Sequence, residues 1–161
     1  MKTQTQELRY YIATPEELTP ADAALVEAAK AATYNSYSPY SHFSVGAAVR
    51  LENGEIVQGS NQENAAYSPT ICAERCAMFY ANAHHPDIAP TAIAIAARGT
   101  DGAFTPQPVS PCGVCRQVMM EFCDPNTFRI LAARSPEDYR VFTLRELMPQ
   151  SFGPADLAKK S

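Results

Sequence analysis

The amino-acid sequence predicts an α/β domain in which a mixed sheet of five strands is covered by helices on both faces. Its 161 residues suit one ordinary domain, which can bury a core without disulfide bonds. Hydrophobic residues make up 46% and charged residues 19%, as in compact globular proteins. Segments of strand and helix periodicity follow in the order hairpin, helix, strand, helix, strand, an order typical of helices packed on both sides of a sheet.

The first half of the chain is expected to form a helix and a hairpin. Thr19 is a candidate N-cap, and a proline suited to the first helical position follows it. Apolar residues then recur at helical spacing up to about Tyr34. Two strands, 43–51 and 56–59, flank Asn53-Gly54, a dipeptide that favours the tight turn of a hairpin.

The second half is expected to alternate helices with buried strands. Apolar residues at helical spacing follow Cys72 and Cys112, so each of these helices is expected to begin near its cysteine. Short apolar runs with β-branched residues predict the strands. The expected elements are a helix from Cys72 to just before Pro86, a strand over 91–97, a helix over 112–123, strands over 128–133 and 139–142, and a short helix over 144–148.

Composition and charge bear on location and partners. No apolar run approaches the ~20 residues that span a bilayer, so no membrane partner is expected. The segment from Met1 to Arg9 is polar and has no apolar signal-peptide core, which predicts a cytoplasmic protein. In that reducing compartment, five cysteines are expected to be ligands or core residues rather than disulfides. A formal net charge of -4 argues against a nucleic-acid partner.

Two short fragments carry residues that could bind a metal: Cys72-Ala73-Glu74 and Pro111-Cys112-Gly113-Val114-Cys115. Each places a cysteine at the expected start of a helix, where free backbone N–H groups and the helix dipole favour a thiolate. Cys112 and Cys115 lie on the same side of one helical turn, and Cys72 would complete a set of three sulfur ligands. Three protein ligands leave the fourth position of a tetrahedral zinc open for water, which describes a catalytic site.

The residues that follow Cys72 suit the chemistry of such a site. Glu74 lies in the first turn of the expected helix, from which its carboxylate can reach toward a metal-bound water. A general acid–base group is needed there to take a proton from the water and return it to the substrate. Arg75 is an adjacent cation that could hydrogen-bond thiolate sulfur and offset the negative charge of three thiolates.

The same cysteines allow less specific interpretations. A Cys-x-x-Cys pair in a reducing compartment also occurs in redox and structural sites. Cys76 lies four residues after Cys72 on one helical face, and as a fourth sulfur ligand it would close the metal site into a structural one. Otherwise Cys76 and Cys123 are expected to be small core residues.

Three blocks occur in order along the chain: Ser38–Ala48 (SPYSHFSVGAA), Asn61–Tyr67 (NQENAAY) leading into Cys72–Arg75 (CAER), and Pro111–Gln117 (PCGVCRQ). Together they resemble the cytidine deaminase family, in its short, homotetrameric branch whose zinc ligands are all cysteines. The resemblance runs from about Tyr34 to Leu157. It implies a single cytidine-deaminase-like domain over residues 1–161 with three α-β-α layers and five strands. Residues 1–19 form an amino-terminal extension to which it assigns no role.

The activity that the resemblance implies is a zinc-dependent hydrolytic deamination. Cytidine and 2′-deoxycytidine would become uridine and 2′-deoxyuridine with release of ammonia, as in pyrimidine salvage. By the resemblance, Cys72, Cys112 and Cys115 bind one zinc per subunit, and Glu74 is the catalytic proton shuttle.

The resemblance also implies how the substrate is held. It assigns substrate contacts to Phe43, which packs against the base, to Asn61 and Glu63, which hold ribose hydroxyls, to Ala65 and Tyr67, and to Phe152 from a neighbouring subunit. The active sites of a homotetramer are shared in this way, with Tyr40 near the same subunit contacts. No Lys or Arg lies between Leu51 and Thr70 to bind a 5′-phosphate, which favours a nucleoside over a nucleotide.

Three alternative functions remain open from the sequence. A blasticidin-type or other small aminopyrimidine deaminase keeps the chemistry, although the Asn61-x-Glu63-Asn64 block argues against it. A non-catalytic zinc or redox module would need no role for Glu74. A polynucleotide deaminase is disfavoured by the net charge and because no stretch mixes basic with aromatic residues.

Overall fold

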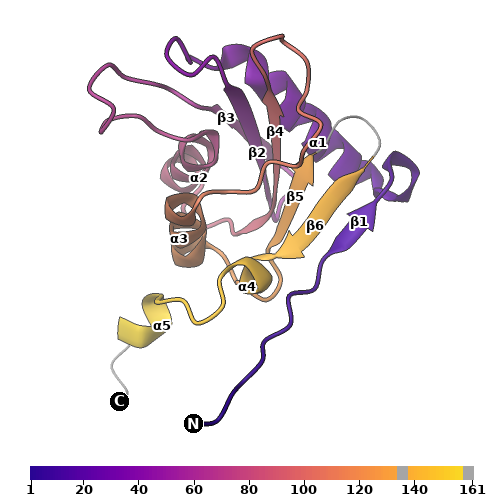
Figure 1. Ribbon diagram of the computed structural model, residues 1–161, viewed down its shortest axis with the longest axis vertical. Coiled ribbons are helices and arrows are strands. Elements are labelled where there is room, and N and C mark those ends of the chain that lie inside the picture. The colour runs from indigo at the N-terminus through magenta and orange to yellow at the C-terminus, as the bar shows by residue number, and fades with distance from the viewer. Residues whose placement is uncertain (134–137, 158–161) are drawn as a thin grey trace.

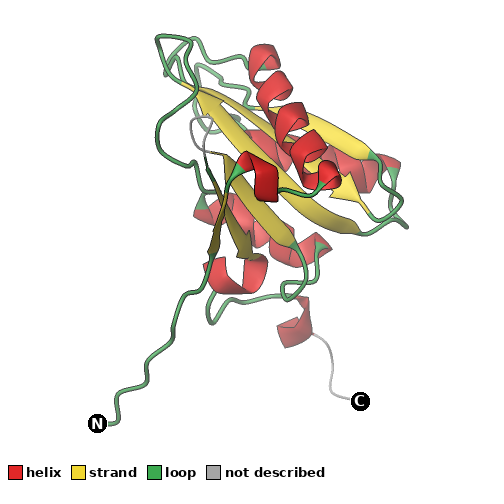
Figure 2. Cartoon of the chain, turned by 90° about the vertical axis from the view of Figure 1, so that its right-hand side faces the viewer, coloured by secondary structure: helices red, strands yellow, loops and turns green. Residues whose placement is uncertain are grey.

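The computed structural model describes residues 1–133 and 138–157, and within them a six-stranded sheet lies between two layers of helices (Figures 1 and 2). Helix α1 covers one face of the sheet, and helices α2 and α3 cover the other. The three-layer α-β-α arrangement predicted from the sequence is therefore confirmed. In chain order the elements are β1 (Tyr11–Ala13), the 3-10 helix η1 (Pro15–Glu17), α1 (Pro20–Ala32), the 3-10 helix η2 (Thr33–Asn35), β2 (Ser44–Leu51), β3 (Ile56–Ser60), α2 (Ala73–His84), β4 (Pro90–Arg98), α3 (Gly113–Phe122), β5 (Arg129–Ala133), β6 (Tyr139–Thr143), α4 (Leu144–Leu147) and α5 (Pro154–Leu157).

The sheet is mixed, with the strand order β1-β6-β5-β4-β2-β3. Strands β4 and β5 run parallel, and the other neighbouring strands are antiparallel. The predicted hairpin is formed by β2 and β3, and Gly54 in its turn has φ of 86°, a backbone conformation that glycine adopts without a steric cost.

The prediction of five strands was wrong, because the amino-terminal extension supplies a sixth. Strand β1 pairs antiparallel with β6, with Tyr11 opposite Val141 and Ala13 opposite Tyr139. Just before it, the Tyr10 ring lies 5.1 Å from the Phe142 ring. A three-residue edge strand is too short to show strand periodicity in the sequence, and its pairing depends on a partner far along the chain.

Two apolar cores lie on opposite faces of the sheet, as alternation along the strands requires. Ala48 and Leu131 point to the α1 face, where they pack with Leu25 of the helix. Ala47 and Ile130 point to the other face, which is covered by α2, α3 and α4. Because both faces are covered, the central strands consist almost entirely of apolar residues.

Two glycines let the helices approach the sheet closely enough to form these cores. A Cβ atom on Gly46 of β2 would collide with the carbonyl oxygen of Ala29 in α1. A Cβ atom on Gly59 of β3 would lie 2.5 Å from Ala77 N and 2.6 Å from Ala73 O in α2. Backbone contact at Gly59 therefore fixes how deep the first turns of α2 sit against the sheet.

The helices begin where the sequence predicts. Thr19 Oγ1 caps α1 by accepting a hydrogen bond from Asp22 N at 3.1 Å. Cys72 and Cys112 directly precede α2 and α3 as their N-cap residues. Helix α1 ends at Ala32, and a 3-10 turn continues it to Asn35. Among the helices of the described ranges, none is long and apolar enough to cross a membrane.

Candidate metal centre and active site

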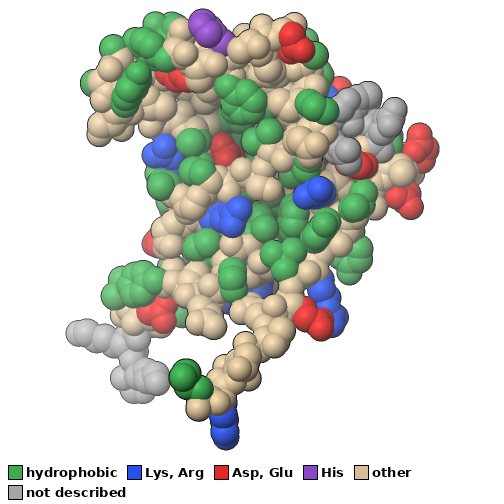
Figure 3. All heavy atoms as spheres, viewed as in Figure 1, with side chains coloured by type: hydrophobic (Ala, Val, Ile, Leu, Met, Phe, Trp, Pro, Cys, Tyr) green, Lys and Arg blue, Asp and Glu red, His purple; other side chains and the backbone are tan. Residues whose placement is uncertain are grey.

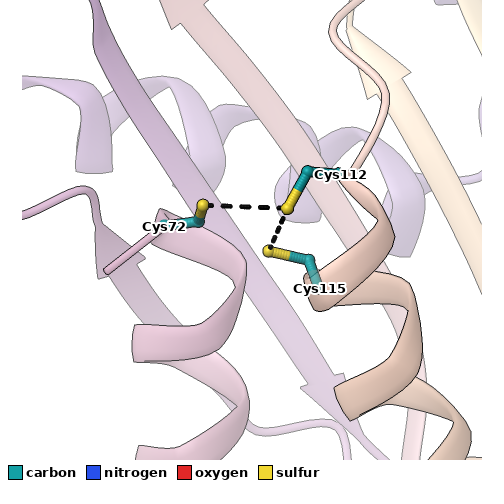
Figure 4. A group of neighbouring side chains, drawn as sticks. All are labelled: Cys72, Cys112 and Cys115. Atoms are coloured by element: carbon teal, nitrogen blue, oxygen red, sulfur yellow. Dashed lines mark hydrogen bonds between the residues drawn. The ribbon is translucent and has the colours of Figure 1, made fainter. Parts of the chain in front are cut away.

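Three cysteine sulfurs converge between the first turns of α2 and α3 (Figure 4). Cys72 Sγ lies 3.9 Å from Cys112 Sγ, and Cys112 Sγ lies 3.4 Å from Cys115 Sγ. In a tetrahedral site with Zn–S bonds of about 2.3 Å, two sulfurs stand about 3.8 Å apart. The three thiols that the sequence singled out thus have the spacing and chemistry of a zinc ligand set.

The surroundings of Cys72 favour its thiolate form. A hydrogen bond from the Cys115 thiol is the largest cause that lowers the pKa of Cys72, and the pKa falls to about 5. Arg75 adds to this effect, with Nη2 3.8 Å from Cys72 Sγ and 3.3 Å from the Thr70 carbonyl oxygen. The interaction with Cys72, together with burial, raises the pKa of Cys115. Arg75 is thus a cation in contact with the Cys72 sulfur.

Glu74 is buried beside the sulfurs, with 4% of its surface exposed. Burial is the main reason that its pKa rises to about 6, and the negative charge of Cys72 raises it further. A carboxyl group whose pKa lies near neutral pH can both accept and donate a proton under physiological conditions. This is the property that a general acid–base group requires.

A cavity of about 200 Å³ opens next to the metal ligands. Glu63, Glu74 and Asn61 contribute polar groups to its wall, and Cys72 and Cys112 reach it from the helix starts. The segment before α2 folds back so that Gln62 and Ile71 form a two-way backbone bridge, with both N···O distances 3.0 Å. That bridge is why Asn61 and Glu63, which lie eleven and nine residues before Cys72, line the same cavity as that cysteine.

The Asn61 side chain is held from three directions. Its Oδ1 accepts hydrogen bonds from Val45 N at 2.8 Å and from Ser36 Oγ at 2.6 Å. Its Nδ2 donates to the Phe43 carbonyl oxygen at 2.9 Å. With the oxygen occupied twice, the second N–H of the amide is the group left to meet a ligand.

The Glu63 carboxylate is also tethered to the turn that precedes β2. Oε2 accepts from Tyr40 N at 2.8 Å and from Ser41 N at 3.2 Å. Oε1 accepts from the Ser41 hydroxyl. The Ser41 hydroxyl is the largest cause that lowers the pKa of Glu63, so this carboxylate stays charged.

Four described residues that were expected from the sequence to contact the substrate do not line this cavity. They are Phe43, Ala65, Tyr67 and Phe152. Tyr67 and Phe152 are 72% and 60% exposed, respectively. Phe152 is linked to α3 through its carbonyl oxygen, which accepts from Gln117 Nε2 at 3.1 Å.

Several residues that line the cavity beside the metal ligands were not predicted from the sequence. Val45 is on the same strand face as the core residue Ala47, and that alternation was a usable signal. Thr70, Ile71 and Ser110 stand one to two residues before a cysteine ligand, so their proximity could have been inferred. Val109 offered no signal, since it lies in a proline-rich loop without periodicity.

The other cysteines stay apart from the metal-binding group. That group consists, within the described chain, of Cys72, Cys112 and Cys115, so the structure does not bring Cys76 to it as a fourth ligand. Burial raises the pKa of the Cys76 thiol, which keeps it protonated. Cys123 is buried in the core on the α2 and α3 face, as predicted.

Comparison with known proteins identifies relatives over most of the chain. Residues 19–130 match the family model described as the cytidine and deoxycytidylate deaminase zinc-binding region. A cytidine deaminase of Halalkalibacterium halodurans is 40% identical over 134 residues, which are 83% of this chain and 95% of the relative. One from Sporosarcina psychrophila is 41% identical over 134 residues, which are 83% of this chain and 93% of the relative.

Solved structures agree with these relatives. The crystal structure of cytidine deaminase from Burkholderia pseudomallei is 42% identical and has a TM-score of 0.70, covering 80% of this chain and 97% of that one. Cytidine deaminase from Mycobacterium leprae is 34% identical with a TM-score of 0.64, covering 82% of this chain and 99% of that one. Because the family model matches residues 19–130 and the relatives are 40% and 41% identical over 83% of the chain, this chain belongs to the cytidine deaminase family.

Proposed function

We propose that this protein removes the 4-amino group from cytidine and 2′-deoxycytidine by zinc-dependent hydrolysis. The observation that carries the proposal is the meeting of a three-thiol metal site with a buried, near-neutral carboxyl group in one cavity. A redox or structural thiol site has no need of Glu74 at this place. The relatives named above are cytidine deaminases, and at 40% identity the same reaction is expected here.

Cys72, Cys112 and Cys115 hold one zinc per subunit. When bound, zinc supplies a Lewis acid that makes a water molecule acidic enough to react at neutral pH. Glu74 would take up one proton of that water and deliver it to N3 of the pyrimidine. It would then take up the second proton from the oxygen added at C4 and deliver it to the departing amine. Its burial excludes bulk water, which would otherwise compete for these protons.

The sugar is expected to lie between Asn61 and Glu63. Asn61 has an N–H left to donate, and the Glu63 carboxylate has lone pairs left to accept, so together they complement a hydroxyl group. No Lys or Arg belongs to the described wall of the cavity. A 5′-phosphate would therefore find no counter-charge, which favours nucleosides over nucleotides.

A homotetramer with shared active sites is part of the proposal. Several large aromatic side chains are exposed in the single chain, as is typical of surfaces that another subunit covers. They include Tyr37, Tyr40, Tyr67, Phe79, Tyr80 and Phe152. Phe152 lies outside the cavity of its own chain, so a role in substrate stacking requires a neighbouring subunit.

Location and substrate size complete the proposal. A reducing cytoplasm suits an enzyme whose three ligand thiols must stay free of disulfides. On the face shown in Figure 3, the described Lys and Arg side chains lie in separate places and do not form the basic track that a polynucleotide requires. The proposed substrates are free nucleosides.

Product analysis with a panel of substrates tests the proposal. We expect the zinc-loaded protein to release one ammonia per uridine formed from cytidine and a matching yield from 2′-deoxycytidine. Cytidine 5′-monophosphate, free cytosine, blasticidin S and single-stranded oligonucleotides should react much more slowly. Preference for blasticidin S would favour the alternative deaminase, and no reaction with any aminopyrimidine would favour the non-catalytic module.

A further inference from the structure

The carboxylate of Glu63 lies on the boundary between two cavities. One is the cavity beside the metal ligands, and the other is a neighbouring space of about 360 Å³ lined by Tyr40, Ser41, Tyr67 and Thr70 together with Glu63 itself. A glutamate has several rotatable bonds, and at this place it could turn toward either space. Something must hold the carboxylate on the side where a sugar would bind.

Ser41 is built to hold it. Its hydroxyl oxygen accepts a hydrogen bond from Phe43 N at 3.1 Å, so its single hydrogen is directed at Glu63 Oε1. The backbone N–H groups of Tyr40 and Ser41 bind the other oxygen. The backbone contacts attach one oxygen only, whereas the hydroxyl adds the second attachment that fixes the plane of the carboxylate.

The turn that carries Ser41 is itself firmly placed. His42 has φ of 54° and donates its N–H to the Ser38 carbonyl oxygen at 3.0 Å, which closes the turn. Directly after it, the Phe43 carbonyl oxygen and Val45 N are both bound by the Asn61 side chain. The turn is thus anchored to one sugar-binding candidate and anchors the other.

From this geometry we infer that Ser41 is a positioning residue for nucleoside binding, which acts by holding the Glu63 carboxylate toward the sugar. The inference rests on the proposed function. Ser41 need not touch the substrate, since Phe43 N and Glu63 already use its hydroxyl. Ser41 is expected to affect substrate binding and not the chemical step, because Glu74 and the metal ligands lie at the starts of α2 and α3, away from the turn that carries Ser41.

Steady-state kinetics of the Ser41→Ala variant test the inference. The KM for cytidine should rise about fivefold to twentyfold, as expected for loss of one charge-assisted hydrogen bond. The kcat should change less than about twofold on the same scale, and zinc content should stay that of the parent. Ser41→Thr retains a hydroxyl and should restore most of the binding. Thr105→Ala is the control, since the Thr105 hydroxyl donates only to the Gln107 carbonyl oxygen at 2.9 Å among the described contacts, and the KM of this variant should match the parent's.

A double-mutant cycle shows whether Ser41 acts through Glu63. In a Glu63→Ala background, adding Ser41→Ala should change KM no further. An undiminished effect in that background would overturn the inference, and so would a parental KM for Ser41→Ala alone. Failure of the parent to deaminate cytidine would instead overturn the proposed function and this inference with it. If the parent deaminates cytidine normally, an unexpected result for Ser41→Ala therefore counts against the inference alone and not against the proposed function.

Discussion

Glu74 is the residue on which the proposed chemistry depends most. Its side chain has 4% of its surface exposed, and its pKa is raised to about 6, mainly by burial. Replacement of Glu74 by Gln keeps the shape and removes the exchangeable proton. We expect kcat for cytidine to fall by at least ~10²–10⁴-fold, the usual contribution of a general acid–base group. Zinc content, measured by elemental analysis of the same sample, should remain that of the parent.

A Glu74→Gln variant that stays active would contradict the role of Glu74 in proton transfer. If the zinc-loaded Glu74→Gln variant kept more than about a tenth of the parent's kcat, proton transfer through this carboxyl could not be a main source of catalysis. Loss of zinc together with activity would point to a structural role instead. Arg75→Ala provides a comparison, because that change removes the cation beside Cys72 and should weaken metal binding rather than proton transfer.

The sequence identified the residues of this centre because their chemistry is local. Cysteines at two helix starts and a glutamate in the first turn of one helix are recognisable without knowing how the helices pack. The tether between Ser41 and Glu63 was not recognisable in that way. It spans 22 residues and depends on the turn conformation at His42, which no residue pattern specifies.

At the scale of elements, the contact between β3 and α2 positions the metal centre. Gly59→Ala would place a Cβ atom 2.5 Å from the backbone of α2, so the helix would have to move away from the sheet. Overpacking of this kind costs about 1–3 kcal/mol of unfolding free energy. Urea unfolding should show that loss, and zinc affinity should fall because Cys72 and Glu74 move with the helix. Parental stability and zinc affinity would show that α2 is not held by this contact.

Helix α1 is held to the sheet by ion pairs between the buried Asp22 carboxylate and two partly exposed arginines. Asp22 lies 3.0 Å from Arg50 Nη1 and 2.9 Å from Arg129 Nη2, and its side chain is 2% exposed. Asp22→Ala should lower the free energy of unfolding by about 1–3 kcal/mol, since it removes the carboxylate that both arginines bind, while water can partly solvate Arg129. Glu27→Ala is the control on the same helix. Its ion pair with Lys30 is largely exposed on the glutamate side, and its loss should cost less than about 1 kcal/mol.

The same ion pairs predict a pH dependence of stability. Burial alone would raise the pKa of Asp22, but hydrogen bonds with Arg129 and Thr19, and Arg50 beside them, outweigh it, and the pKa is lowered. A carboxyl group whose folded pKa lies below the unfolded value stabilises the fold above about pH 4 and loses that contribution as the pH falls further. The parent should therefore lose stability more steeply below about pH 4 than Asp22→Asn does, when urea unfolding is measured at several pH values. Parallel curves for the two proteins would contradict the ionic role of Asp22.

Elements differed in how well the sequence predicted them. Helix α1 and the β2–β3 hairpin carry strong local signals, a Thr-Pro start and an Asn-Gly turn, and both formed as expected. Strand β1 has no such signal, because its three residues are strand only through pairing with β6. That long-range pairing is why a five-stranded sheet was expected and six strands are present.

At the scale of the whole molecule, Phe152 tests whether active sites are shared. Its ring is 60% exposed in the single chain, and it lies outside the cavity beside the metal ligands. In a homotetramer it would stack on the base in a neighbouring site. Phe152→Ala should then raise KM for cytidine several-fold to tenfold, since aromatic contacts contribute ~0.5–1.5 kcal/mol beyond area burial. Zinc content should not change.

Light scattering on the parent provides the second half of this test. We expect about four times the mass of one chain at assay concentration. A fully active monomer would refute shared sites while leaving the deaminase chemistry intact. The expectation of a homotetramer rests on the fragment around Phe152 and on a family resemblance. The sequence carries no further signal for it, because assembly depends on the shape and chemistry of whole surfaces and not on short motifs.

Zinc-dependent deamination of cytidine is tested most directly by restoring zinc to stripped protein. The metal is removed with a chelator, zinc is added in steps, and the fall in ultraviolet absorbance on conversion of cytidine to uridine is followed. With Cys72, Cys112 and Cys115 as the ligand set, the rate should rise linearly and level off at one zinc per subunit. Parental turnover by protein shown to be metal-free, or a rate that levels off only at two zincs per subunit, would contradict the account.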